Sequence, residues 1–328
     1  MESISLPLMS GAKKTTRLGL GTASLMREPS RRKRMYVLEA AYDAGFRHFD
    51  TAPLYGLGAA ESELGDFLSR TTGDCTVATK YGLLPSDLAK LLAKVQRPMR
   101  AAIRRSGTLR RAVRSVGNVA RASLTAPTIG EFRQSVESSL SAMQLDFIDI
   151  VLMHDMPWSE RSADFWEGLR SSDQIPGVGL VGVAGDSTLL SHYPTDFLRQ
   201  LPLVQTVTTP LPGKVSLDLP HFIIQYGALS LGMKQLSLLL VAKPKVRREL
   251  ESIVGHEVVS LENVADFICC LSLASAPGSM LLVGTTTARH AERIWKACER
   301  DLTTFQQHRE SIVSTLTSHS DGDRDGSS

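Results

Sequence analysis

Short apolar runs rich in β-branched residues alternate along the chain with segments in which apolar residues recur every three or four positions. The first pattern is typical of buried strands and the second of helices that pack on one face. The runs predict eight strands, at residues 18–22, 46–50, 76–80, 147–154, 179–183, 203–207, 222–226 and 280–283. Helices are predicted between most of them, for example at residues 34–44, 61–68, 129–143, 163–171 and 261–275. This order predicts an α/β protein, and a (β/α)8 TIM barrel rather than an open sheet.

One predicted helix has recognisable signals at both ends. Residues 34–44 carry apolar side chains at helical spacing, Ser30 precedes them as a possible N-cap, and Gly45 follows as a stop. The basic run from Arg31 to Arg34 is therefore interpreted as an exposed first helical turn rather than as a targeting signal.

Two segments depart from the alternation. Residues 83–126, after the third predicted strand, are rich in arginine and partly helical in pattern, which predicts a long basic insertion. Residues 318–328 are rich in Gly, Asp and Ser, which predicts a disordered tail. The expected organisation is a single barrel over residues 1–317 that contains the insertion.

The overall composition says little about the fold or the function, whereas the distribution of charged residues along the chain is uneven. With 328 residues, 42% hydrophobic and 22% charged, the protein has an ordinary globular composition, which excludes a collagen, a disordered chain and a disulfide-rich mini-protein. Its net charge is +3, yet residues 90–121 hold ten Lys plus Arg and no acid. The remainder then holds 27 basic and 34 acidic residues, a balance of −7. The basic character therefore belongs to one segment.

The cysteines indicate a reducing environment. The chain has four cysteines, Cys75, Cys269, Cys270 and Cys298. They form no C-x-x-C pair and no Cys/His cluster at metal-ligand spacing, so we expect free thiols and no metal site. Residues 1–16 lack the order of a secretory signal, and no apolar stretch approaches the roughly 18 residues of a membrane span. We expect a cytoplasmic protein.

Four ionisable residues stand at or just after the ends of successive predicted strands: Asp50, Tyr55, Lys80 and His154. In a parallel barrel these ends share the face that carries active sites. A phenol titrates near 10, so Tyr55 can give a proton at neutral pH only if its phenolate is stabilised, and Lys80 can provide that charge. Asp50 would keep a buried Lys80 charged, and His154 would orient a substrate carbonyl.

Each of these four residues, taken alone, also fits a structural role. An acid or an amine at a strand end is often a turn residue or half of an ion pair, and a tyrosine or a histidine is often a packing residue. Their occurrence together on successive strands favours a catalytic site.

Six blocks of the sequence carry a family resemblance, at residues 17–22, 45–56, 63–65, 78–80, 135–140 and 146–154. In order and spacing they resemble the aldo-keto reductase superfamily, over about residues 18–297. The Gly182-Val-Ala-Gly185 turn and the long loop after strand three look most like its sugar or aldose dehydrogenase-like branch. The resemblance implies NAD(P)-dependent reduction of a carbonyl, or oxidation of the alcohol, without metal. It places the catalytic tetrad on the same four residues, with Tyr55 as general acid and base.

The resemblance also implies a cofactor pocket. It assigns the nicotinamide carboxamide to Gln205, ring stacking to Tyr226, and further cofactor contacts to Gly21 and Thr22. The family's frequent Ser-Asn pair after strand five is Ala184-Gly185 here, which removes two polar side chains from the carboxamide site.

Residues 283–293 resemble the segment that holds the adenosine phosphate. Thr285 and Thr286 can offer hydroxyls at the start of the following helix, and Arg289 and Arg293 add positive charge. We therefore expect NADP, with NAD as the alternative. The family's usual Arg or Gln is His290 here, and a solvated basic helix face is the competing interpretation.

The insertion leaves three interpretations open: a lid over the active-site mouth, a site for nucleic acid or an anionic membrane surface, or a solvated loop. Residues 90–121 contain no aromatic side chain that could stack on bases, so nucleic acid is not expected. The expected partner is a small carbonyl or sugar substrate, and the expected state is a monomer or weak oligomer. The alternative function is a catalytically weak or inactive barrel that binds a partner or regulates, which the altered Ala184-Gly185 and His290 positions favour and the intact tetrad disfavours.

Overall fold

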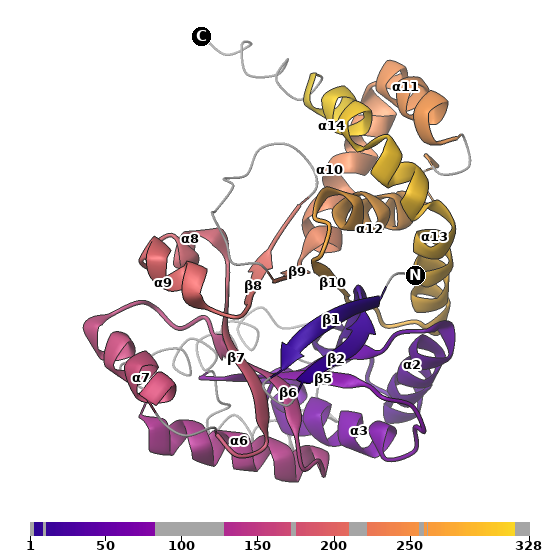
Figure 1. Cartoon of the computed structure of the whole chain (residues 1–328). Coiled ribbons are helices and arrows are strands. Elements are labelled where there is room, and N and C mark those ends of the chain that lie inside the picture. Colours follow the sequence, from indigo (N-terminus) through magenta and orange to yellow (C-terminus); the bar gives the residue numbers. More distant parts are fainter. Residues whose placement is uncertain are drawn as a thin grey trace, which may run out of the picture.

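The computed structural model describes residues 3–8, 11–82, 128–171, 175–209, 222–255, 259–260 and 262–318, arranged as in Figure 1. The predicted insertion at residues 83–126 lies outside the described residues, and so does the predicted tail beyond Ser318. The division into a barrel over residues 1–317 and a tail therefore stays a prediction.

Eight parallel strands close into a barrel. They are β3 (Leu18–Gly21), β4 (His48–Asp50), β5 (Thr76–Tyr81), β6 (Ile148–His154), β7 (Val178–Gly185), β8 (Val204–Val207), β9 (Ile223–Tyr226) and β10 (Met280–Val283). Each strand pairs with the next one along the chain, and β10 returns to pair with β3. The predicted (β/α)8 barrel is confirmed, with all eight strands at or near their predicted bounds.

Helices follow the strands and surround the barrel (Figure 1). They are α1 (Thr22–Leu25), α2 (Arg31–Ala44), the 3-10 helix η1 (Tyr55–Gly58), α3 (Ala59–Leu68), α6 (Ile129–Met143), α7 (Glu160–Ser171), α8 (Ser187–Leu190), α9 (Thr195–Gln200), α10 (Ala228–Ala242), α11 (Pro244–Val254), α12 (Val264–Ser275), α13 (Ala288–Gln307) and α14 (Arg309–Ser318). The five helices named from the sequence correspond to α2, α3, α6, α7 and α12. Within the described ranges, no helix has both the length and the apolar character needed to cross a membrane.

The ends of α2 follow the sequence signals. The side chain of Ser30 accepts a hydrogen bond from the backbone N–H of Lys33, which confirms the N-cap. Gly45 ends the helix with a φ of 124°, and a Cβ atom there would lie 2.4 Å from the Trp295 ring of α13. Glycine is therefore required at this position for two reasons, the backbone turn and the close packing of α2 on α13.

A hairpin that the sequence analysis missed precedes the barrel. β1 (Ser3–Leu8) pairs with β2 (Gly11–Thr16) in antiparallel fashion. Leu6 is fully buried and packs with side chains of the barrel interior, including Ile150 and Ile224. The hairpin thus adds Leu6 to the apolar cluster of the barrel interior. The alternation of Ile4 and Leu6 with polar neighbours is the signal that identifies it.

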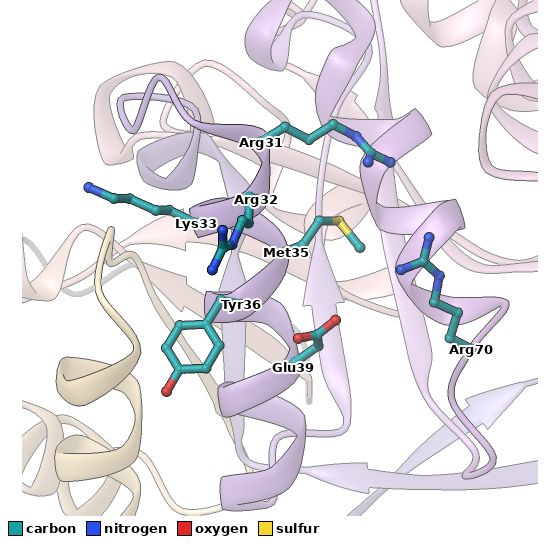
Figure 2. A pocket seen from close by; sticks show the side chains of 7 residues that line it. All are labelled: Arg31, Arg32, Lys33, Met35, Tyr36, Glu39 and Arg70. Atoms are coloured by element: carbon teal, nitrogen blue, oxygen red, sulfur yellow. The ribbon is translucent and has the colours of Figure 1, made fainter.

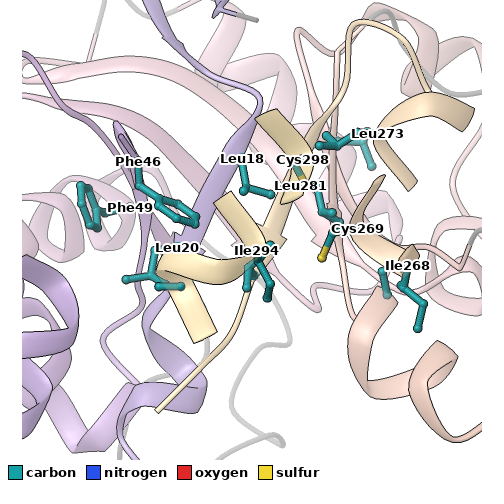
Figure 3. Close-up of a cluster of buried hydrophobic side chains, with 14 of the residues drawn as sticks. Leu18, Leu20, Phe46, Phe49, Ile268, Cys269, Leu273, Leu281, Ile294 and Cys298 are labelled. Carbon is teal, nitrogen blue, oxygen red and sulfur yellow. The ribbon is translucent and has the colours of Figure 1, made fainter. Parts of the chain in front are cut away.

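The main hydrophobic core lies between the outer surface of the strands and the helices. Figure 3 shows part of it, where Leu18 and Leu281 of adjacent strands face Cys269 of α12 and Ile294 and Cys298 of α13. The Sγ atoms of Cys270 and Cys298 lie 3.7 Å apart, and all four cysteines are free thiols. These thiols therefore serve as small apolar core residues.

The first turn of α2 is exposed as predicted, with one exception. Arg31, Arg32 and Lys33 are exposed, whereas Arg34 is buried and donates from Nε to Oε2 of Glu63 over 2.7 Å, which ties α2 to α3. Figure 2 shows a surface cavity beside this turn, lined by Arg31, Arg32, Lys33, Met35, Tyr36, Glu39 and Arg70. Asp66 pairs with Arg31, so acids offset part of the positive charge.

Candidate active site

A buried ion pair forms the base of the site. Asp50 is the last residue of β4, and its Oδ1 lies 2.6 Å from Nζ of Lys80 on β5. Lys80 also donates to the backbone carbonyl of Thr51 over 2.9 Å. The side chains of Lys80 and Asp50 are only 2% and 4% exposed, so each compensates the charge of the other inside the protein.

Tyr55 and His154 complete the set. Tyr55 begins η1, just after β4, and its ring centroid lies 4.9 Å from Nζ of Lys80. His154 ends β6, and its ring stands perpendicular to that of Tyr55 with 6.1 Å between the ring centroids. The structure therefore brings together the four residues that the sequence places at strand ends.

The charges of the site act in opposite directions on the phenol. Burial raises the pKa of Tyr55 above its ordinary value, the charge of Lys80 opposes this shift, and the charge of Asp50 adds to it. Burial would lower the pKa of Lys80, but the charge of Asp50 holds it above its ordinary value. Lys80 thus stays an ammonium beside the phenol, as predicted, although its charge does not reverse the effect of burial on Tyr55.

Gln205, assigned by resemblance to the cofactor, also joins this network. It lies on β8, is 2% exposed, and its Nε2 donates to Oδ2 of Asp50 over 2.8 Å. Asp50 therefore holds Lys80 with one oxygen and Gln205 with the other. The sequence analysis did not identify this contact, because the two residues are 155 positions apart.

The remaining residues assigned to the nicotinamide end lie at the same end of the barrel. Tyr226 is the last residue of β9 and is half-buried, and burial raises the pKa of its phenol. Gly21 ends β3 and pairs in register with Asp50. Thr22 is buried, and its hydroxyl donates to Oγ1 of Thr51 over 3.1 Å. The Thr22 side chain therefore makes an internal contact.

Ala184 and Gly185 occupy the end of β7, in register with His154 and Thr206. A Cβ atom on Gly185 would lie 2.4 Å from Cδ2 of Leu189 on α8. Leu189 thus fills the space next to Gly185, and the two polar side chains frequent in this pair are replaced by small and apolar surface.

The N-terminus of α13 can attract an anion. Thr287 precedes the helix without a capping side chain, and the first turn holds no acid. Thr286 is half-buried and Arg289 is exposed there, whereas Thr285 is buried and uses its hydroxyl on the backbone of Thr287. This end combines a helix dipole with a cation.

Arg293 lies one turn further along α13 and points elsewhere. Its Nε donates to Oδ1 of Asp266 on α12 over 3.1 Å, and the Asp266 side chain is 10% exposed. Burial raises the pKa of Asp266, and the charge of Arg293 opposes this shift. Part of the positive charge predicted for the phosphate is thus compensated by an acid that the sequence analysis missed.

A closed parallel barrel that gathers a phenol, an ammonium and an imidazole at one end of its strands has groups suited to proton transfer at the oxygen of a bound molecule. The sequence model of the aldo/keto reductase family matches residues 17–185, more than half of the chain. The chain therefore belongs to the aldo/keto reductase family.

Two curated proteins are similar to parts of the chain. D-threo-aldose 1-dehydrogenase from a Pseudomonas species is 30% identical over 190 residues, 57% of this chain and 54% of that protein. Pyridoxal 4-dehydrogenase from Microbacterium luteolum is 44% identical over 72 residues, 21% of each chain. The matches thus span about half the length of the first relative and about a fifth of the second.

Solved structures share the fold at low identity. The glycerol dehydrogenase of Gluconobacter oxydans has a TM-score of 0.63 and 17% identity, over 99% of this chain and 98% of that one. An aldo-keto reductase from Klebsiella pneumoniae in complex with NADPH has a TM-score of 0.60 and 14% identity, over 94% of this chain and 96% of that one.

Proposed function

We propose that the protein reduces a carbonyl group of a small aldehyde, ketone or sugar with NADP(H), or oxidises the corresponding alcohol, and that Tyr55 is its general acid and base. The observation that carries the proposal is the position of Tyr55 between Lys80, 4.9 Å from its ring, and His154, with 6.1 Å between ring centroids. The similarity to an aldose dehydrogenase supports a sugar among the candidate substrates.

The charges around Tyr55 explain how its hydroxyl group can give and take a proton. In reduction, the Tyr55 hydroxyl donates its proton to the substrate oxygen and becomes a phenolate. Burial disfavours this phenolate, and the Lys80 ammonium offsets that cost. In oxidation, the phenolate takes the proton of the substrate alcohol. His154 orients the oxygen beside the phenol, and Asp50 keeps Lys80 charged and in place.

A bound nicotinamide cofactor supplies the hydride that the carbonyl carbon accepts. The residues present fit such a group: Tyr226 offers an aromatic face at the end of β9, and the uncapped start of α13, with Thr286 and Arg289, suits a phosphate. Because Arg289 adds a cation there, NADP is the cofactor proposed, with NAD as the alternative. Five further cofactor contacts are proposed from the family resemblance alone: Gln205, Gly21, Thr22, Thr285 and Arg293.

Titration with NADPH tests the binding half of this proposal. We expect the fluorescence of NADPH to change on addition of the protein and to reach saturation. Tyr55→Phe should give a similar NADPH titration curve, because we assign the hydroxyl group of Tyr55 to proton transfer and not to cofactor binding. No change in fluorescence for the unaltered protein would contradict the proposal and would favour a barrel that binds a partner instead.

A further inference from the structure

The backbone directly after Tyr55 follows an unfavourable path. The three residues at positions 56–58 all lie in the left-handed region, with φ values of 58°, 61° and 90°. Leu57, unlike its two neighbours, is not a glycine, and this conformation is unfavourable for such a residue. Backbone of this kind persists only where the surrounding structure holds it. The contacts that hold this turn therefore also determine where the Tyr55 ring stands.

Two backbone hydrogen bonds hold the turn from within. The N–H of Tyr55 donates to the carbonyl of Ala52 over 3.0 Å, and the N–H of Leu57 donates to the carbonyl of Leu54 over 3.2 Å. Both bonds join residues of the same loop. They define the shape of the turn, whereas its position on the barrel depends on contacts with other elements.

Met26, on the loop after β3, makes such a contact. A Cβ atom on Gly56 would lie 2.6 Å from Sδ and 2.9 Å from Cγ of Met26, so the thioether fills the space that a side chain at position 56 would need. Met26 is half-buried and packs against the main hydrophobic core. The residue next to Tyr55 is thus in close contact with a side chain from a different strand–helix connection.

The segment that carries Met26 is itself anchored to the barrel. Met26 follows α1 directly, and its backbone N–H donates to the carbonyl of Thr22 over 3.2 Å. The Thr22 hydroxyl donates to Oγ1 of Thr51, the first residue after β4, and Leu25 is fully buried. A methionine side chain adapts its shape to its surroundings, but its backbone is fixed here. Met26 therefore restrains the turn from one side.

We propose that Met26 is a positioning residue: its thioether, packed on Gly56, holds the turn so that the Tyr55 hydroxyl stays aligned with the substrate oxygen. This inference rests on the proposed function, because it concerns the proton donor of that reaction. Met26 acts through Tyr55 and not on the substrate. A misplacement of about 1 Å at a reacting group lowers a rate by as much as roughly a hundredfold.

Substitutions of Met26 test the role directly. We expect Met26→Ala to lower kcat for carbonyl reduction roughly tenfold and to leave NADPH affinity unchanged, because the cavity lets the turn shift. Met26→Leu nearly conserves the volume and should keep most of the rate. Met26→Val should show an intermediate loss and serves if Met26→Ala does not fold. Met233→Ala is the matched control, because it removes the same side chain from α10, where Met233 is 40% exposed, and it should change neither quantity.

The Tyr55→Phe background separates positioning from general packing. If Met26 acts through the phenol hydroxyl, adding Met26→Ala to Tyr55→Phe should cause no further loss of the residual rate. A residue that only supports the fold would instead lower the rate by the same factor in both backgrounds, because the two losses would be independent.

Gly56→Ala gives a second test through the same contact. Its methyl group needs the space of the thioether, so the double variant with Met26→Ala should lose less kcat than the product of the two single losses. Gly58→Ala is the control. Its φ is also positive, yet among the described residues a Cβ atom there would meet no atom within 4 Å, so its loss and that of Met26→Ala should multiply.

The outcomes distinguish the inference from the proposed function. An unchanged kcat in Met26→Ala, or the same fold-loss in the Tyr55→Phe background, would overturn the inference and leave the proposed function intact. Absence of Tyr55-dependent carbonyl reduction in the unaltered protein would overturn both.

Discussion

The side-chain amide of Gln205 donates a 2.8 Å hydrogen bond to Oδ2 of Asp50. The other oxygen of Asp50 holds Lys80, so the position of the ammonium beside Tyr55 depends on a carboxylate fixed from two sides. The network therefore spans three barrel strands, β4, β5 and β8, which restrains the side chains of the site far better than a loop would.

We predict that Gln205→Leu lowers kcat/KM roughly tenfold, the effect of about 1.4 kcal/mol at the transition state. It should also lower the free energy of unfolding by about 1–3 kcal/mol, because an oxygen of Asp50 loses its partner. Gln225 of β9 is the matched control. It is also buried, but its Nε2 donates to Oγ of Ser279, away from the tetrad.

Gln225→Leu should therefore lose stability in denaturant unfolding and keep its rate of carbonyl reduction. Equal loss of activity in the two glutamine variants would show that Gln205 matters only for folding. An unaltered rate in Gln205→Leu would contradict the role of the Asp50 network.

The two arginines of α13 should differ in their effect on the cofactor. Arg289 is exposed at the first turn, whereas Arg293 is paired with Asp266. We expect Arg289→Ala to weaken NADPH binding about tenfold and NADH binding far less, because only NADPH carries the additional phosphate. Fluorescence titrations with both nucleotides measure this difference.

Arg293→Ala should change NADPH affinity less than Arg289→Ala and should lower the free energy of unfolding, because it leaves the largely buried Asp266 without its cation. A loss of NADPH affinity in Arg293→Ala that equals the loss in Arg289→Ala would show that the pair with Asp266 opens when the cofactor binds.

A buried histidine outside the tetrad predicts how stability depends on pH. His48 is fully buried, its Nδ1 lies 2.9 Å from Oγ1 of Thr76, and burial together with the charge of Lys80 lowers its pKa to about 3. The unfolded chain takes up a proton at this histidine below about pH 6.5, and the folded protein does not do so until about pH 3. The free energy of unfolding should therefore fall as the pH drops through this window.

Urea unfolding between pH 7 and pH 4 tests this expectation. His48→Gln should flatten the curve by about 1.4 kcal/mol per pH unit well below pH 6.5, the slope of one proton. His308→Gln, a change at an exposed histidine, is the control and should leave the curve as in the unaltered protein. An unchanged slope in His48→Gln would refute the assignment.

Local sequence signals were sufficient for the barrel and for the four strand-end residues. Apolar runs predict strands wherever both faces are buried. Asp50 and His154 end β4 and β6 as predicted, and Lys80 lies one residue before the end of β5. The hairpin before the barrel was missed because its alternation is short. The role of the insertion stays a prediction, since residues 83–126 lie outside the described part of the chain. The cytoplasmic location also stays a prediction.

Contacts between distant residues could not be predicted in the same way. Gln205 meets Asp50 only because the barrel closes, and Arg293 meets Asp266 only because α12 packs on α13. Neither pair has a spacing or a motif that marks it.

The most direct test of the central claim is the rate of NADPH oxidation with a carbonyl substrate by Tyr55→Phe, at saturating cofactor. Loss of the general acid should reduce the rate about a hundredfold or more, while NADPH still binds. A Tyr55→Phe protein that binds NADPH and keeps a rate similar to that of the unaltered protein would contradict the assignment of the proton to Tyr55.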